Sequence, residues 1–248
     1  MALSNGVLVH GPNAWGAAIR AADGSISSAS GKKRRFAASV STPFLRGPLR
    51  LAEALAVLPD VRRALPGARF AFERPRVAVA MIAGTAAAGA ARRSSLKLPI
   101  REAVAAFASL APAMLALRSG ELAAYHGAEH ISIGTYETGL PATREHGRCG
   151  GHLVGPLLLT SAAASVLAAR APVSARPAAR ALGAVGAVGA AVEVFAWMER
   201  NPGHPVASAL ARPGHELQTR ISTAEPSAAQ LAVAEAALAA CLAAEEAV

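Results

Sequence analysis

Four apolar segments constrain the fold of this chain more than any other feature of its sequence. They cover residues 77–91, 103–117, 153–169 and 181–198, and all are rich in Ala and Gly. A helix that spans a bilayer needs about 20 mostly apolar residues, so the first two segments are short. Small residues nevertheless let membrane helices pack closely. The segments predict a mainly α-helical, polytopic membrane protein, with a soluble, buried helical bundle as the alternative.

The composition favours the membrane protein over the soluble bundle. Hydrophobic residues make up 53% of the chain and charged residues 17%, and the mean hydropathy is +0.34. A soluble domain carries about 25% charged residues. The two cysteines, Cys149 and Cys241, form no disulfide framework, which is typical of a reducing compartment. The N-terminus has no basic stretch followed by an apolar one, so no signal peptide is predicted.

The chain is strongly basic, with a formal net charge of +9. Its basic run at residues 32–35 has no interleaved aromatic residues, so a surface that binds nucleic acid is not predicted. A flank facing anionic lipid is the better interpretation, and the lipid bilayer is the expected partner. If all four segments span, both ends of the chain and residues 119–152 share the side with more Lys and Arg. The positive-inside rule places that side in the cytoplasm and the protein in the cell membrane.

The chain divides into four expected regions. Short β-type runs near the N-terminus predict a small β-hairpin element that turns at Asp23-Gly24. An amphipathic helix suited to a membrane surface is expected next. The regions are a β and loop element at 1–42, the amphipathic helix at 43–76, a helical membrane core at 77–198 with a motif loop at 119–152, and a turn and helix at 199–248.

One polar cluster stands out in this apolar chain, beginning with His126-Gly127-Ala128-Glu129-His130. Its form is H-x-x-E-H, and residues four apart on a helix share one face. Two imidazoles placed this way can bind one divalent metal ion, and the intervening Glu129 can act as general base. This is the inverzincin arrangement, so the motif predicts a metal site, with zinc as the expected ion.

A catalytic zinc site usually has three protein ligands, so a third ligand is needed. Four residues are candidates: Glu137, His146, Cys149 and His152. On a straight helix Glu137 lies about 10 Å beyond His130. A helix break at Gly134 would bring its carboxylate back toward the metal.

Each member of the cluster also has a purely structural interpretation. The two motif histidines can hydrogen-bond backbone at a helix end, Glu137 can pair with Arg144 or Arg148, and Cys149 can be a small buried residue. Four of the seven histidines fall within residues 126–152, and this concentration favours a site. Other enzyme classes lack their motifs, because the chain has no phosphate-binding loop, no dinucleotide fingerprint and no nucleophile elbow.

The sequence resembles the YqhQ-like family of bacterial membrane proteins, which are described as predicted metal-dependent enzymes. The similarity lies in YHGAEH followed by YE and H-x-RCG, in NGVLVHGPNAWGAAIR at 5–20, in PFLRG at 43–47 and in PGHELQTRISTAEP at 213–226. The resemblance implies several membrane helices around the motif. The site residues that it implies are His126, Glu129, His130, Tyr136, Glu137, His146, Arg148 and Cys149.

The chain departs from the family pattern in three places. Asn5 stands where the family tends to have Glu, the stretch between Glu137 and His146 is short, and RCGG replaces RCGT. An inactive member of the family is the alternative that these departures raise.

Three functions follow from the sequence. The first is a metal-dependent hydrolase at the cytoplasmic face, with Glu129 as general base and a metal held by His126 and His130 together with Glu137, His146 or Cys149. The second is a non-enzymatic assembly or scaffold protein, in which the cluster is a structural metal site or a hydrogen-bonded joint. A carrier ranks last, because Glu193 is the lone ionisable residue within the four apolar segments.

Overall fold

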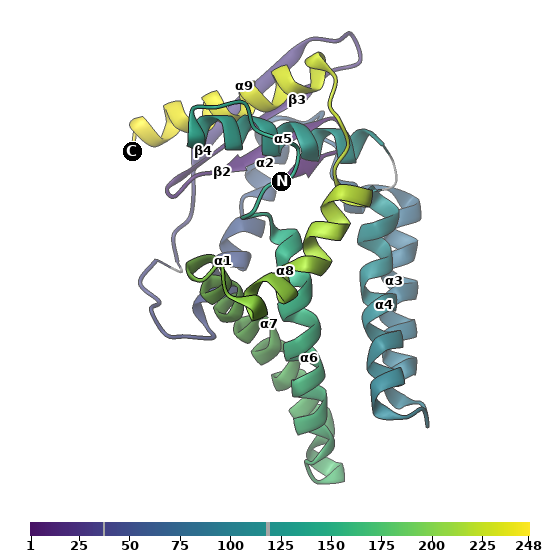
Figure 1. Ribbon diagram of the computed structural model, residues 1–248. Helices are drawn as coiled ribbons and strands as arrows, with labels where there is room; N and C mark the ends of the chain where they lie inside the picture. Colours follow the sequence, from purple (N-terminus) through teal and green to yellow (C-terminus); the bar gives the residue numbers. More distant parts are fainter. Residues whose placement is uncertain (37, 118–119) are drawn as a thin grey trace.

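The computed structural model describes residues 1–36, 38–117 and 120–248 and is mainly helical (Figure 1). A sheet-bearing part lies at the top of Figure 1, and two long helical hairpins extend from it. The α-helices are α1 (Arg46–Leu55), α2 (Leu58–Ala64), α3 (Pro75–Arg93), α4 (Leu98–Leu117), α5 (Glu121–Thr138), α6 (Val154–Ala169), α7 (Arg176–Arg200), α8 (Pro205–Leu217) and α9 (Ala228–Glu246).

The N-terminal element is a four-stranded antiparallel sheet in the order β1-β2-β3-β4. Its strands are β1 (Ala2–Leu3), β2 (Gly6–His10), β3 (Ala14–Arg20) and β4 (Ile26–Lys32). The predicted hairpin turn at Asp23-Gly24 joins β3 to β4, and Gly24 there has a φ of +86°. The prediction of a small N-terminal β element is confirmed, and the sheet is larger than the expected hairpin.

Both faces of the sheet are covered, which explains why β3 is buried along almost its whole length. Alternate side chains of a strand point to opposite faces. On one face Leu8 and Trp15 pack against α2 and the residue before it, through Val61 and Val57 among others. The other face, which carries Val7, Val9 and Ala18, packs against α5 and α9.

Helix α9 crosses the sheet so closely that Gly16 of β3 has no room for a side chain. A Cβ atom at this position would overlap the backbone of Cys241 on α9. The α9 carboxylate Glu245 also accepts hydrogen bonds from the backbone of Asn13 and Ala14. The C-terminal helix is therefore fastened to the N-terminal sheet.

The predicted amphipathic helix is divided into two helices in the structure. The sequence places Leu51, Leu55 and Leu58 on one face, but α1 ends at Leu55 and α2 begins at Leu58. Pro59 opens α2, where its missing N–H costs nothing. Leu51 and Leu55 are exposed, as on a helix lying on a membrane, whereas Leu58 packs beneath the sheet.

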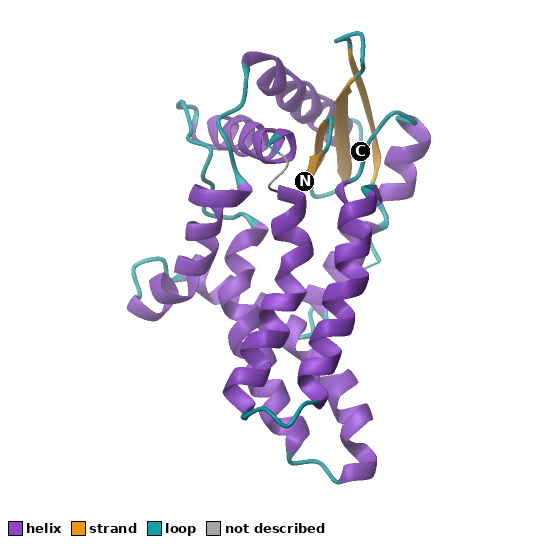
Figure 2. Cartoon of the chain, turned by 90° about the vertical axis from the view of Figure 1, so that its right-hand side faces the viewer, coloured by secondary structure: helices purple, strands orange, loops and turns teal. Residues whose placement is uncertain are grey.

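The two hairpins are α3 with α4 and α6 with α7, and they lie side by side (Figures 1 and 2). Within the described chain, four helical segments are long and apolar enough to cross a membrane: Ile100–Leu117, Gly150–Ala169, Val173–Arg200 and Ala228–Glu246. The mainly helical membrane fold is thus confirmed. The first three segments contain the second, third and fourth predicted spans.

The other two long helices differ from the sequence-based expectation. The first predicted span, residues 77–91, lies in α3, which pairs with α4 but is not among the four membrane candidates. Helix α9 is among them, yet its buried residues Val233, Ala234 and Ala237 pack on the sheet. Its apolar character is explained by that packing.

Candidate metal centre

Helix α5 carries the H-x-x-E-H motif as a regular helix rather than as a loop. Residues one turn apart share a face, and the ring centroids of His126 and His130 lie 4.3 Å from each other. The helix continues through Gly134 to Thr138 and ends at Gly139, whose φ is +69°. The expected break at Gly134 does not occur, and this glycine instead leaves room for Ala142 of the returning chain.

Backbone carbonyl groups fix the tautomer of both motif histidines. Nδ1 of His126 lies 2.7 Å from the carbonyl oxygen of Ser222, and Nδ1 of His130 lies 2.7 Å from that of Arg144. A carbonyl oxygen only accepts hydrogen bonds, so each Nδ1 carries the proton and donates it. Each Nε2 therefore carries the lone pair, as in histidines that bind metals, and that of His126 faces the Cys149 sulfur.

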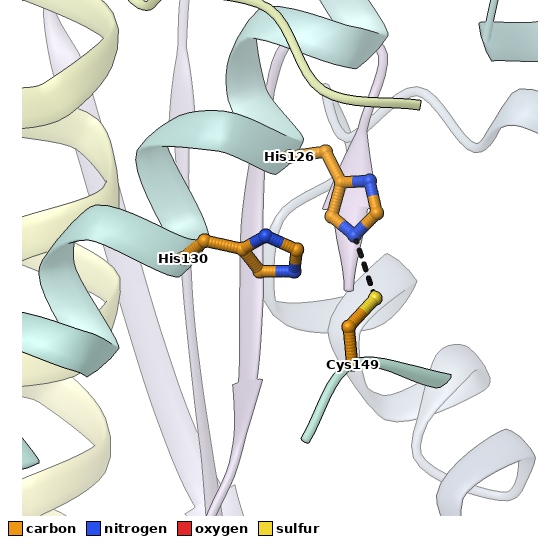
Figure 3. Close-up of side chains that lie close together, drawn as sticks. All are labelled: His126, His130 and Cys149. Atoms are coloured by element: carbon orange, nitrogen blue, oxygen red, sulfur yellow. Dashed lines mark hydrogen bonds between the residues drawn. The ribbon is translucent and has the colours of Figure 1, made fainter. Parts of the chain in front are cut away.

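Cys149 completes a group of three potential ligands (Figure 3). Its Sγ atom lies 3.6 Å from Nε2 of His126, and the ligand atoms of His126, His130 and Cys149 all lie within 4.8 Å of one another. In a tetrahedral zinc site with bonds of about 2.3 Å to sulfur and about 2.05 Å to nitrogen, these two ligand atoms are about 3.5 Å apart. The donor set and its spacing fit a divalent metal ion such as zinc.

Glu129 lies beside this group with one oxygen engaged and one without a partner. Its Oε1 forms an ion pair with the ammonium group of Met1. Its Oε2 is buried and finds no hydrogen-bond partner among the described residues. Burial opposes ionisation, but the Met1 ammonium and the two motif histidines outweigh it, so the pKa of Glu129 is below its ordinary value. The carboxylate is charged at neutral pH.

Burial shifts the pKa values of His130 and Cys149 in opposite directions. Burial, then the charge of His126, lowers the pKa of His130 to about 4, so its imidazole is neutral at physiological pH. Burial raises the pKa of the Cys149 thiol, and the charge of Glu129 adds to this effect. The Cys149 thiolate therefore needs a nearby cation to form.

The other predicted ligands, Glu137 and His146, lie next to this group and bind each other. Oε2 of Glu137 is 3.1 Å from Nε2 of His146, and Oε1 forms an ion pair with Arg148. The Nδ1 atom of His146 accepts a hydrogen bond from the Arg148 backbone, so its Nε2 carries the proton. The His146 ring lies 5.6 Å from that of His130.

A buried glutamine, Gln218, holds the loop that carries Cys149. Its Oε1 accepts from the backbone N–H of His146, and its Nε2 donates to the carbonyl of His146 and to Nε2 of His152. The remaining nitrogen of His152 faces the carbonyl of Ala211. Both nitrogens of His152 are therefore used, which removes this candidate third ligand from the metal set.

Three residues that shape the site had no role predicted from the sequence. Gln218 and Ser222 belong to a single turn of π-helix (Gln218–Ser222), a feature often found at functional sites. The only feature of the sequence that pointed to them was the family-like segment at 213–226, in which both lie. The third residue without a predicted role is His10 on β2. Its Nδ1 is buried without a partner in the described structure, and the residue interacts electrostatically with Glu129.

These features define a multi-pass helical membrane protein with a His, His and Cys cluster in its sheet-bearing part. The chain belongs to the family described as "Protein of unknown function (DUF1385)", whose model matches residues 120–244, half of the chain. The matched region contains the whole cluster and Gln218. No curated protein and no solved structure matches the chain. The resemblance to YqhQ-like proteins and the metal dependence stay predictions.

Proposed function

We propose that the protein is a divalent-metal-dependent hydrolase of the membrane, with its site at the cytoplasmic face. His126, His130 and Cys149 are the proposed ligands, and zinc is the expected ion. The observation that carries the proposal is the pair of Nε2 acceptor atoms that the Nδ1 hydrogen bonds leave beside the Cys149 sulfur. A bound zinc ion would lower the pKa of a water molecule to near 7.

Glu129 is the proposed general base. Its charged carboxylate lies beside the ligand group, and its Oε2 has no partner among the described residues. A buried oxygen without a hydrogen bond is costly, so it is expected to serve a ligand or a reacting group. Three ligands and a carboxylate with one oxygen still without a partner in the described structure suit a catalytic site better than a closed structural one.

A cysteine nucleophile activated by His126 is a weaker interpretation of the same residues. The 3.6 Å separation of Cys149 and His126 and the orienting Ser222 carbonyl resemble a nucleophile and base pair. Nucleophilic cysteines have a lowered pKa, however, whereas burial raises the pKa of Cys149. A metal cation would supply the positive charge that the thiolate requires.

The decisive experiment measures the metal content of the detergent-purified protein by elemental mass spectrometry. We expect about one zinc ion per chain in the wild type and close to none in the His126→Ala, His130→Ala double variant. His204→Ala is the matched control, because His204 is exposed and distant from the cluster in sequence. A metal-free wild type with normal thermal unfolding would refute the proposal.

The general-base role needs a separate test with Glu129→Gln. This variant is expected to keep the metal but to lose hydrolysis of ester, peptide and phosphoester probes by about 100-fold or more. Equal activity in the two proteins would remove Glu129 from the reaction.

A structural metal site is the second candidate, and one observation favours it. The cluster and its hydrogen bonds join α5, the loop around Cys149 and the π-helical turn, so a metal there would fasten three segments. A structural site has four protein ligands, whereas a catalytic site has three and a water. X-ray absorption spectroscopy of the zinc-loaded protein counts the ligands and separates the candidates.

A further inference from the structure

A groove between the two hairpins combines an apolar wall with a basic end. The apolar part encloses about 700 Å³ between α4 and α6 and is lined by small or aliphatic side chains, including Ala106, Leu110, Leu157 and Ala162. A second cavity of about 270 Å³ lies toward the hairpin ends that point away from the sheet. Arg92, Glu102 and Ser161 line both cavities, so the two adjoin each other.

The second cavity is positively charged. Arg92, Arg101 and Arg180 line it against a single carboxylate, Glu102. That carboxylate accepts a hydrogen bond from Ser165 at 2.9 Å, and its oxygens lie 3.8 Å and 3.7 Å from Nε of Arg92 and of Arg101. One carboxylate cannot neutralise three guanidinium groups, so the cavity keeps an excess of positive charge.

Two of these arginines retain unused hydrogen-bonding capacity. The Nε atom of Arg101 is buried and has no hydrogen-bond partner among the described residues. The side chain of Arg180 forms no hydrogen bond or ion pair with any residue that the structure describes. Guanidinium groups bind phosphate oxygens in a two-pronged geometry, so this end of the groove suits a phosphate group.

We propose that the groove binds an anionic phospholipid, with its phosphate at the three arginines and an acyl chain along α4 and α6. The order of the two parts fits a bilayer, because the arginines lie near the ends of membrane-spanning segments and the apolar wall lies between those ends. Guanidinium groups in a pocket between membrane helices suit an anionic headgroup. The bound lipid fills the space between two hairpins whose helices α4 and α6 touch little.

The test is native mass spectrometry of the full-length protein in detergent, titrated with phosphatidylglycerol or with phosphatidylcholine of the same acyl chains. We expect phosphatidylglycerol to bind about tenfold more tightly, since each arginine near a headgroup contributes attraction. The triple variant Arg92→Gln, Arg101→Gln, Arg180→Gln should lose this preference. Equal binding of the two lipids by the wild type would overturn the proposal.

The matched control removes three charges from the same end of the hairpins without touching the groove. It is Arg93→Gln, Lys97→Gln, Arg170→Gln, whose side chains are exposed and do not line either cavity. The control should keep the preference for phosphatidylglycerol. If it loses as much affinity as the groove variant, general electrostatic attraction explains the binding and the specific site is refuted.

Two further probes separate a lipid from free phosphate. Ala162→Trp fills the apolar part and should abolish lipid binding while leaving the arginines in place. Inorganic phosphate and glycerol 1-phosphate, which lack acyl chains, should fail to displace the lipid at millimolar concentration. Displacement by either one, or lipid binding that survives Ala162→Trp, would overturn the assignment to a lipid. If the triple variant does not fold, Arg180→Gln alone should weaken the preference by about fivefold.

Discussion

Gly127, between the motif residues His126 and Ala128, allows the chain that follows the π-helical turn to approach α5. A Cβ atom there would overlap the carbonyl oxygen of Ala224, whose backbone N–H donates to Ala123 at 2.9 Å. The same approach brings the carbonyl of Ser222 to His126. The glycine is thus part of the site although it has no functional group.

Gly127→Ala should therefore damage both stability and metal binding. Overpacking of this kind costs about 1–3 kcal/mol, because the backbone must shift. We expect a lower thermal unfolding midpoint and a loss of zinc, measured on the same purified sample. Gly147→Ala is the control, since a Cβ at Gly147 meets no atom within 4 Å. Equal behaviour of the two variants would contradict the close approach.

His10 gives a pH prediction that does not require metal. Burial, followed by the positive charges of the Met1 ammonium and Lys33, lowers the pKa of His10 to about 4 from its ordinary value of 6.5. A lowered folded-state pKa means that the folded protein resists protonation, so stability is retained above pH 6.5 and lost as the pH falls toward 4. The loss is about 2 kcal/mol, less than the full shift because His10 is half-buried.

His10→Leu should flatten this part of the stability profile. Thermal unfolding midpoints measured from pH 7.5 to pH 4.5 should fall less steeply for the variant than for the wild type. His215→Leu, at an exposed histidine, should leave the slope unchanged. A wild-type slope in His10→Leu would show that other groups cause the acid sensitivity.

At the scale of elements, α1 is attached to α7 by an ion pair and by close backbone contact. Arg46 pairs with Glu193, the acidic residue that was expected to stand alone within a membrane segment. Gly189 on α7 has no room for a Cβ because the backbone of Phe44 lies against it. Glu193 thus has a structural partner, which weakens the carrier interpretation.

Glu193→Gln should release α1 from α7 with little effect on the rest of the fold. The pair is partly exposed, so its loss should cost little stability. We expect trypsin to cleave after Arg46 several-fold faster in the variant. Glu199→Gln, which removes a charge near the end of the same helix, is the control. Unchanged cleavage would show that the backbone contact alone holds α1.

The sequence predicted elements well where their pattern is local. The hairpin at Asp23-Gly24 and three of the four membrane segments depend on neighbouring residues, and each is present. The role of α9 was not predictable, because its Ala-rich apolar face suits a membrane and a sheet equally. Tertiary packing alone distinguishes the two.

The candidate site was likewise predictable only where its pattern is local. The spacing of His126 and His130 identifies one half of it. The tautomers of these histidines and the anchoring of Cys149 depend on carbonyl and amide groups from distant segments, such as Ser222, which lies 96 residues from His126. Backbone carbonyls have no signature in a sequence, so this half had to come from the structure.

At the scale of the whole molecule, both hairpins leave the sheet-bearing part and return to it. Their turns, near Ser95 and Ser174, lie at the end away from the sheet in Figures 1 and 2. In a bilayer the two turns should therefore share one side, and the β3–β4 turn at Asp23 should lie on the other.

Cysteine labelling tests this arrangement. A membrane-impermeant maleimide added to sealed cells should label Ser95→Cys and Ser174→Cys but not Asp23→Cys, if the sheet is cytoplasmic. The wild type is the control, because its Cys241 is buried and Cys149 is partly buried. Opposite labelling of the two serine positions would show that the hairpins do not both cross and return.

The fastening of α9 to the N-terminal sheet has a consequence during synthesis. The strands leave the ribosome first, but the helix that covers Val7, Val9 and Ala18 together with α5 leaves it last. Translation proceeds at about 5–20 residues per second, so one apolar face of the sheet stays exposed for some tens of seconds before α9 is synthesised. The nascent N-terminal sheet therefore depends on the bilayer or a chaperone to shield this face until α9 has been synthesised.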